Sequence, residues 1–372
     1  MSLTAKKTLL AWAASAAAGL GLIALAYAPP GEVRPAFATD PVGEDPDDPA
    51  IWLHPSHPER SLILATDKTA APAGAVYVFG LDGKVRQKVA GLDRPNNIDV
   101  EYGLRLGGRP VDIAVATERY QRRLRVFRID PEEGRIADVS SSANLATFAG
   151  ETGEAGAPMG IALYKRPRDG AVFAVVSPKT GPRKGYLAQY RLEDDGAGRV
   201  RSTLVRRFGS FSGAGEIEAV AVDDALGYIY YADEGNGIHK YHADPDHPEA
   251  ARELAHFGQA GFHGDREGIA LYTRRDGTGY LVCTDQVQGN SRYNIYRREG
   301  APGRPHDHSQ LLGSVSGGAD STDGLEITPA NLGPRFPNGM MVAMNSAPRN
   351  FLVFRWDDVA SAAGLVTGAS GR

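Results

Sequence analysis

GAVYVFGLDGKV, residues 74–85, alternates apolar and other side chains, carries an aromatic residue at Phe79 and runs into an Asp-Gly turn. Period-two alternation closed by such a turn is typical of a β-strand. The arrangement recurs in five more segments: LRVFRIDPEEGRI from 124, LAQYRLEDDGAGRV from 187, IHKYHADPDHPEA from 238, YNIYRREGAPGR from 293 and FLVFRWDDVA from 351. The six aromatic positions lie 48 to 63 residues apart: Phe79, Phe127, Tyr190, Tyr241, Tyr296 and Phe354.

Two further strands accompany each copy of this segment. One is a plain apolar strand, such as SLILATD from 61. The other precedes it in the chain and starts at a polar position. This polar-start strand occurs as DDPAIWL, NNIDVEYG, APMGIALY, EIEAVAVDD, DREGIALY and STDGLEIT. Each unit of about 50 residues supplies three clear strands and room for a fourth, which is the size of a propeller blade. The sequence therefore predicts an all-β fold, a six-bladed β-propeller; a pair of β-sandwiches would not explain a sixfold recurrence.

The N-terminus is separate from this repeat. A basic start, MSLTAKK, precedes an apolar run of 21 residues from Thr8 to Ala28, the pattern of an export signal. Small residues allow cleavage after Ala38 or, less well, after Ala28, and the run is long enough to remain as a membrane anchor. We divide the chain into a signal peptide or anchor, residues 1–38, and a propeller domain, residues 39–372. We expect export to the periplasm or the extracellular space, with membrane contact only through that segment.

Composition narrows the classes of partner. The 372 residues carry a net charge of −4, whereas nucleic-acid binding domains are usually basic, so no nucleic-acid partner is expected. Cys283 is the only cysteine, and an intrachain disulfide is therefore impossible. An exported chain without disulfides must be held by its core or by metals. We expect a monomer.

The polar starts of six strands predict a metal site. In a propeller the innermost strand of each blade lines the central channel, so these starts converge at one mouth. Five of the six blades place a carboxylate there, in the positions Asp47 and Asp48, Asn97 and Asp99, Glu216 and Glu218, Asp265 and Glu267, and Asp320 and Asp323. Crowded carboxylates repel one another unless a divalent cation neutralises them, and an oxygen-only ligand set favours Ca²⁺. The alternative is that each acid caps a tight turn.

Basic residues form a second signal beside the acids. They follow the second strands or lie in adjacent loops: Lys68, Arg119, Lys179, Arg183 and Lys184. Cations around a metal-loaded mouth suit an anionic ligand, which the metal bridges and the side chains clamp. The alternative is ordinary solvated surface charge.

Taken in order, DPDDPAIWLHP, RPNNIDV, EAVAVDDALGYIYYADE, DREGIALY, QGNSRYNIY and STDGLEITPANLGPRFPNG resemble the β-propeller phytases, from about Asp40 to Ala360. The resemblance implies a secreted, calcium-dependent 3-phytase-type phosphoric monoester hydrolase. Such an enzyme converts phytate (myo-inositol hexakisphosphate) to lower inositol phosphates and orthophosphate by direct attack of metal-bound water. It implies phytate or another phosphorylated small molecule as the partner.

The resemblance also implies roles for single residues. The calcium ligands would be Asp48, Glu218, Glu234, Asp265, Glu267 and Asp323. Asp265 and Glu267 would also position the attacking water, and phosphate would be bound by Lys68, Arg119 and Lys179. The expected catalytic set is therefore Glu267, Asp265, Glu218, Lys68, Arg119 and Lys179.

Several positions depart from the family pattern. They are Met159 in place of Tyr, Thr69 in place of Lys, Asn345 in place of Asp, a displaced Asp320 and a shortened acidic stretch at 233–235. Each departure removes or moves a phosphate or calcium contact. Two alternatives therefore stay open: a non-catalytic calcium-stabilised binding propeller, and a propeller hydrolase for a different phosphate ester. A lactonase-type site would need few carboxylates and no cationic clamp.

Overall fold

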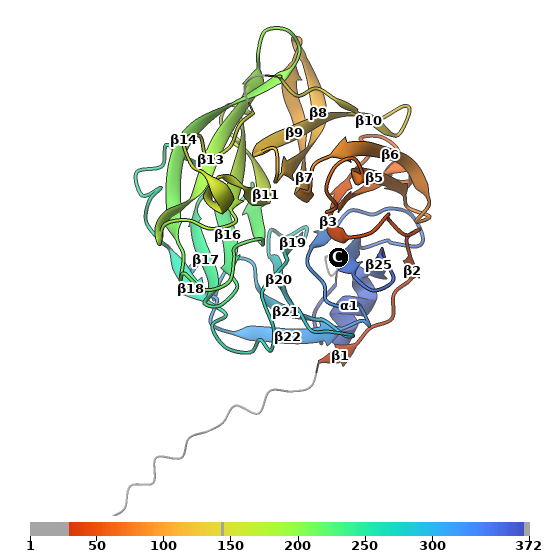
Figure 1. Ribbon diagram of the computed structural model, residues 1–372. Helices are drawn as coiled ribbons and strands as arrows, with labels where there is room; N and C mark the ends of the chain where they lie inside the picture. The colour runs from red at the N-terminus through yellow and green to blue at the C-terminus, as the bar shows by residue number, and fades with distance from the viewer. Residues whose placement is uncertain (1–29, 143–144, 368–372) are drawn as a thin grey trace, which may run out of the picture.

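The computed structural model describes residues 30–142 and 145–367. Within them, six β-sheets surround a central channel, which confirms the predicted all-β, six-bladed propeller (Figure 1). The apolar run from Thr8 to Ala28 lies outside the described residues. In the described part, no helix combines the length and the hydropathy of a membrane span.

Each blade contains strands that pair antiparallel in chain order, from the channel outwards. The first blade holds β3 (Pro46–Trp52), β4 (Leu62–Asp67), β5 (Gly74–Gly80) and β6 (Val85–Leu92). The second holds β7 (Pro95–Leu106), β8 (Arg109–Glu118), β9 (Arg123–Asp130) and β10 (Arg135–Asp138). The third holds β11 (Pro158–Lys165), β12 (Val172–Pro178), β13 (Lys184–Asp194) and β14 (Val200–Ser210).

The other three blades follow the same plan. The fourth holds β15 (Val220–Asp223), β16 (Tyr228–Asp233), β17 (Gly237–His242) and β18 (Ala255–Phe257). The fifth holds β19 (Ile269–Thr273), β20 (Gly279–Asp285), β21 (Arg292–Arg297) and β22 (Leu311–Ser316). The sixth takes β23 (Leu325–Thr328), β24 (Met340–Asn345) and β25 (Asn350–Arg355) from the end of the chain, and α1 (Trp356–Ala362) follows them. Two 3₁₀ turns, Pro58–Arg60 and Gly153–Gly156, lie in loops.

Two strands from the start of the chain close the ring. β2 (Phe37–Ala38) pairs antiparallel with β25 and becomes the fourth strand of the sixth blade. β1 (Gly31–Glu32) pairs in parallel with β22 and adds a fifth strand to the fifth blade. The residues just before the predicted domain boundary at 38 and 39 therefore belong to the sheets; the boundary itself stays a prediction.

The recurring aromatic residues lie in the third strand of each blade and form the core. All six are buried: Phe79, Phe127, Tyr190, Tyr241, Tyr296 and Phe354. Each packs in a cluster shared by neighbouring blades; the ring of Phe79, for example, lies 6.3 Å from that of Phe351 in the sixth blade. The aromatic residues whose recurrence predicted the fold are therefore the residues that pack one blade against the next. This packing fixes the six inner strands around one channel.

Candidate functional site

The mouth of the channel is built where the inner strands begin. Asp47 lies in β3, whereas Glu218, Glu267 and Asp323 each lie two residues before an inner strand, β15, β19 and β23 respectively. Because these strands surround the channel side by side (Figure 1), residues far apart in the chain meet at its mouth. The fold therefore brings these acidic strand starts together at one mouth, as predicted for them.

Glycines at the starts of three inner strands set how closely the blades approach. A Cβ on Gly268 would lie 2.8 Å from the carbonyl oxygen of Asp323, and a Cβ on Gly324 would lie 2.1 Å from Asp48 Oδ1. A Cβ on Gly160 would lie 2.0 Å from the carbonyl oxygen of Glu218. In each pair the glycine of one blade contacts the acidic position of the next. The absence of a side chain therefore draws the acids together.

A polar residue at or next to the end of each second strand holds the segment that leads into the inner strand. Asp285 Oδ1, for example, accepts the N–H groups of His263 at 2.7 Å and Gly264 at 2.8 Å. The six residues that accept such bonds are Asp67, Glu118, Ser177, Asp233, Asp285 and Asn345. Sequence analysis recognised the strands but missed this role. The signal was present, because each second strand carries a polar residue at its last or next-to-last position.

Three of the six predicted calcium ligands form one tight cluster. One carboxylate oxygen from each of Glu234, Asp265 and Glu267 lies within 4.8 Å of the others. Glu267 Oε2 is buried and has no hydrogen-bond partner among the described residues. Burial, together with the charges of Glu218 and Glu234, raises the pKa of Glu267 well above its ordinary value. Burial and Glu218 likewise raise the pKa of Glu234 to about 8. The cluster is therefore unfavourable as a set of bare charges and fits a cation.

Lys68 joins the opposite side of the mouth. Its Nζ lies 2.6 Å from Asp47 Oδ1 and 2.9 Å from Asp323 Oδ2. Burial alone would lower the pKa of Lys68, but Asp47, Asp323 and Glu218 outweigh it and raise that pKa above its ordinary value. Asp47 Oδ2 is buried without a hydrogen-bond partner in the described part of the chain. Asp47, rather than Asp48, is therefore the acid of β3 that faces Lys68.

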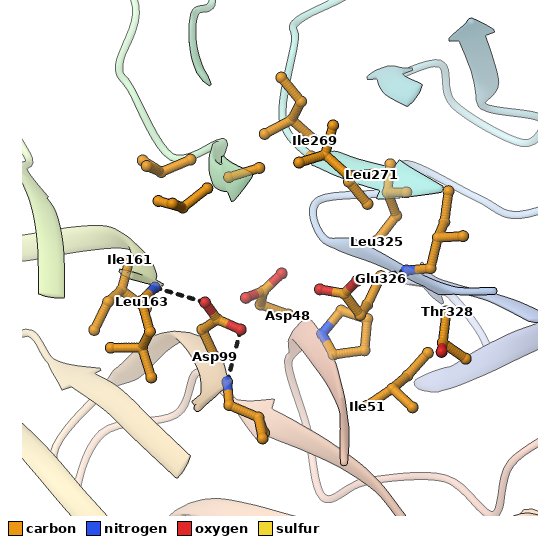
Figure 2. Close-up of a pocket in the computed structure, with 18 of the residues that line it drawn as sticks. Asp48, Ile51, Asp99, Ile161, Leu163, Ile269, Leu271, Leu325, Glu326 and Thr328 are labelled. Atoms are coloured by element: carbon orange, nitrogen blue, oxygen red, sulfur yellow. Dashed lines mark hydrogen bonds between the residues drawn. The ribbon is translucent and has the colours of Figure 1, made fainter. Parts of the chain in front are cut away.

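Asp48 lies deeper, inside the channel. Figure 2 shows the carboxylates of Asp48, Asp99 and Glu326 facing the same hollow, which has a volume of about 370 Å³. Asp48 Oδ2 accepts the N–H of Ile98 at 3.0 Å, and Asp99 Oδ2 accepts that of Leu163 at 2.7 Å. The register of β3 on β4 is irregular between Pro46 and Pro49, and within this stretch Asp47 contacts Lys68 while Asp48 accepts the N–H of Ile98. The role of Asp48 as a calcium ligand stays a prediction.

These channel carboxylates hold protons tightly. Burial raises the pKa of Asp99 to about 7 and that of Glu326 to about 8. Apolar side chains line the same hollow, including Ile51, Leu163 and Leu271 (Figure 2). The acids of this chain therefore occupy two levels, one at the mouth and one inside the channel.

The predicted phosphate-binding cations lie on one side of the mouth. Asn96, a fully buried residue that sequence analysis did not single out, links Arg119 to the acids: Arg119 Nη1 donates to Asn96 Oδ1 at 3.4 Å, and Asn96 Nδ2 donates to Glu218 Oε2 at 3.2 Å. Lys179 pairs with Glu216. Burial and the charge of Arg119 lower the pKa of Lys179. A hollow of about 360 Å³ beside this group is lined in part by Arg94, Arg119 and Arg122.

The other departures and cations have local explanations. Met159 is fully buried, so a larger Tyr there would have to displace its neighbours to reach the mouth. The carboxylate of Asp320 accepts the N–H groups of Gly289 and Ala347, and therefore ties two loops together rather than facing the mouth.

Two of the predicted cations lie away from the acids. Arg183 donates to the carbonyl oxygen of Ser212, and Lys184 is exposed. Among the described residues, neither Arg183 nor Lys184 forms an ion pair with an acid of the mouth.

A cluster of carboxylates beside a wall of cations can bind a metal ion and an anion together. Acids hold the metal, and the metal and the cations share the anion. A phosphorylated small molecule meets both requirements, because its oxygens are acceptors for cations and ligands for hard metals.

Known proteins are similar to this chain over most of its length. A family model described as Phytase matches residues 2–367. A 3-phytase from Bacillus subtilis (strain 168) is 30% identical over 336 residues, which are 87% of this chain and 83% of that protein. Among solved structures, a structural genomics protein of unknown function from Bacteroides thetaiotaomicron VPI-5482 is 11% identical with a TM-score of 0.46, covering 87% of this chain and 74% of that one.

Proposed function

Because this chain belongs to the phytase family and is a phosphoric monoester hydrolase, we propose that it releases orthophosphate stepwise from phytate in a calcium-dependent reaction at the mouth of the channel. One observation supports the metal and the location most directly. Glu267 Oε2 is buried without a partner among the described residues, inside a cluster with Glu234 and Asp265. An acceptor in that state costs stability unless a cation satisfies it.

The donor set supports calcium over zinc. The mouth offers carboxylate oxygens and neither a thiolate nor an imidazole in the cluster, and Ca²⁺ prefers oxygen ligands. The residues that would hold calcium are Glu218, Glu234, Asp265, Glu267 and Asp323, with Asp48 approaching from the channel. When bound, calcium would neutralise these acids, attract phosphate oxygens and acidify water for attack on phosphorus.

The chain's own side chains would bind and orient the ester. Arg119 stays charged and can make two parallel hydrogen bonds to one phosphate, whereas Lys68 and Lys179 act as point charges. Lys68 already contacts Asp47 and Asp323, which holds its ammonium group in place before substrate binds. Glu267 Oε2 can accept a hydrogen bond from a water and aim it at phosphorus. These roles suit direct attack by water, without a phosphoenzyme.

We also propose export of the chain to the periplasm or the extracellular space. The basic start and the apolar run of residues 8–28 support it. Cleavage after Ala38 would remove β1 and β2, whereas cleavage after Ala28 would leave both paired. Of the two sites, the pairing of these strands therefore favours Ala28.

Phosphate release from calcium phytate by the purified chain tests the proposal. We expect release that stops when a chelator removes calcium and returns when calcium, but not magnesium, is added back. Release that continues unchanged in the chelator would contradict calcium dependence. Binding of calcium and phytate with no release from any phosphate ester would favour the binding propeller instead.

A further inference from the structure

The outer edge of the fourth blade carries a second group of metal-ligating side chains, unlike the mouth in chemistry. β17 and β18 pair antiparallel, with His239 directly opposite His256, and Glu253 lies just before β18. One nitrogen of each ring and one carboxylate oxygen of Glu253 lie within 4.8 Å of one another. Opposed residues of an antiparallel pair have Cβ atoms about 5 Å apart, close enough to share one ligand.

His239 carries the observation that points to a ligand. The residue is 2% exposed, and its Nε2 is buried without a hydrogen-bond partner among the described residues. Its Nδ1 lies 2.8 Å from Glu253 Oε2. A buried ring nitrogen with no hydrogen-bond partner is costly, and a metal ion that binds this nitrogen removes that cost.

The surroundings orient these donors. The ring of His239 stacks between Tyr231, at 4.8 Å, and His256, at 4.2 Å. Tyr241 donates its hydroxyl to Glu253 Oε2 at 3.1 Å, the kind of outer hydrogen bond that fixes a ligating carboxylate. His256 is half-buried and borders a groove of about 970 Å³, and its Nε2 lies 3.0 Å from the carbonyl oxygen of Asn236. Binding a shared ion through Nε2 would therefore replace this contact.

We propose that His239, Glu253 and His256 bind a divalent transition metal of the zinc class at the edge of the fourth blade, separately from the mouth. Two imidazoles and one carboxylate are typical ligands for Zn²⁺, whereas Ca²⁺ binds oxygen. Three protein ligands leave one coordination position for water. Because β18 has only three residues and lies at the edge of its sheet, the metal would tie this edge strand to β17.

Zinc titration of the untagged, calcium-saturated protein tests the site, because calcium blocks the mouth. We expect one zinc ion per chain, at least about tenfold weaker binding in His256→Ala and in Glu253→Gln, and unchanged binding in His247→Ala. His247 is a matched control: it lies in the same blade and stacks on His242 at 3.6 Å, outside the cluster. Cobalt in place of zinc should give the visible absorption of a four-coordinate, nitrogen-ligated ion in the parent and not in His256→Ala.

Several outcomes would overturn the proposal. These are no zinc binding by the parent, equal affinity in the parent and His256→Ala, or an equal loss in His247→Ala. If His256→Ala does not fold, Glu253→Gln decides alone, since Glu253 lies at the surface and Gln keeps its size. Phosphate release should stay the same in every variant of this cluster. That readout separates failure of this site from failure of the proposed phytase reaction.

Discussion

The environment of Glu267 distinguishes it from an acid that caps a turn. The charges of Glu218, Glu234 and Asp323 surround it, and one of its oxygens has no partner in the part of the chain described. A residue that only capped a turn would use its oxygens on nearby N–H groups, as Asp320 does. A metal ligand at this position must therefore be negatively charged, whereas a turn cap needs only to accept a hydrogen bond.

Glu267→Gln separates these roles. Gln keeps the size and can accept a hydrogen bond, but it cannot provide the negative charge that a cation needs. We expect phosphate release to fall at least about a hundredfold, the scale of one lost catalytic group, while the melting temperature in calcium moves by only a few degrees. Glu132→Gln, at a side chain that is 83% exposed, is the control. More than half of the parent activity in Glu267→Gln would make this residue structural.

Glu326 provides a test of the channel acids by pH. Burial raises its pKa from 4.5 to about 8, so the folded chain binds this proton more tightly than the unfolded chain does. The contribution favours folding below about pH 4.5 and is lost as the pH rises through about 8. Glu326→Gln cannot ionise and still accepts the N–H of Ile327. In a chelator at pH 9, we expect the variant to be more stable than the parent by up to about 5 kcal/mol, with a difference below about 1 kcal/mol at pH 5.

Urea unfolding at the two pH values measures this difference. Glu132→Gln should show no such dependence on pH, because its carboxylate is exposed in the folded chain as well. An advantage of Glu326→Gln that is the same at pH 5 and pH 9 would show that packing, not ionisation, is its cause.

At the scale of elements, the inner strands and the glycines beside them decide how narrow the mouth is. Gly268 separates Glu267 from β19 and contacts the backbone that leads into β23. Its φ angle lies outside the left-handed region, so the reason for glycine here is space and not backbone conformation. The geometry of the acids thus depends on a residue with no chemistry of its own.

Gly268→Ala tests this dependence. The added Cβ would lie 2.8 Å from the carbonyl oxygen of Asp323 and 3.0 Å from the amide nitrogen of Leu325, both backbone atoms. We expect a loss of about 1–3 kcal/mol in the free energy of unfolding, together with weaker phosphate release, because the fifth and sixth blades must move apart. Gly235→Ala is the matched control, with its nearest contact at 3.4 Å. Equal stability of the two variants would rule out close approach as the reason for Gly268.

The whole molecule is a ring that its own first residues close. β2 completes the sixth blade, and the N–H groups of Val33 and Ala36 bond to β22 and β25. Without this segment, the edges of two outer strands would be exposed, and exposed strand edges invite pairing with other chains. Closure of the ring therefore links the position of the proposed signal cleavage to the stability of the fold.

The melting temperatures of two chains, one starting at Pro30 and one at Thr39, measure how much closure of the ring stabilises the fold. We expect the shorter chain to melt several degrees lower, since about 1 kcal/mol corresponds to a few degrees even in larger domains, and to aggregate more readily. The chain that starts at Pro30 keeps β1 and β2 and serves as the control. Equal melting temperatures would mean that blade packing alone holds the ring, and cleavage after Ala38 would then be compatible with the fold.

Local pattern alone determined much of this protein. Alternation, turn residues and the spacing of six aromatic residues specify strands and their number, because strand formation and core packing depend on nearby side chains. The acids at strand starts were readable for the same reason. Their division into two levels was not, because whether Asp47 or Asp48 faces Lys68 depends on strand register and on contacts across blades.

Only the tertiary structure decided which distant residues meet. Asn96 beside Arg119 and Glu218, β2 beside β25, and His239 opposite His256 all join segments whose proximity no local signal records. Such contacts follow from the closure of the ring and the register of each sheet, which are properties of the whole chain. Local sequence therefore specified the blades and the acidic positions, whereas the packing of blade against blade decided which of these acids face the cations and which are buried in the channel.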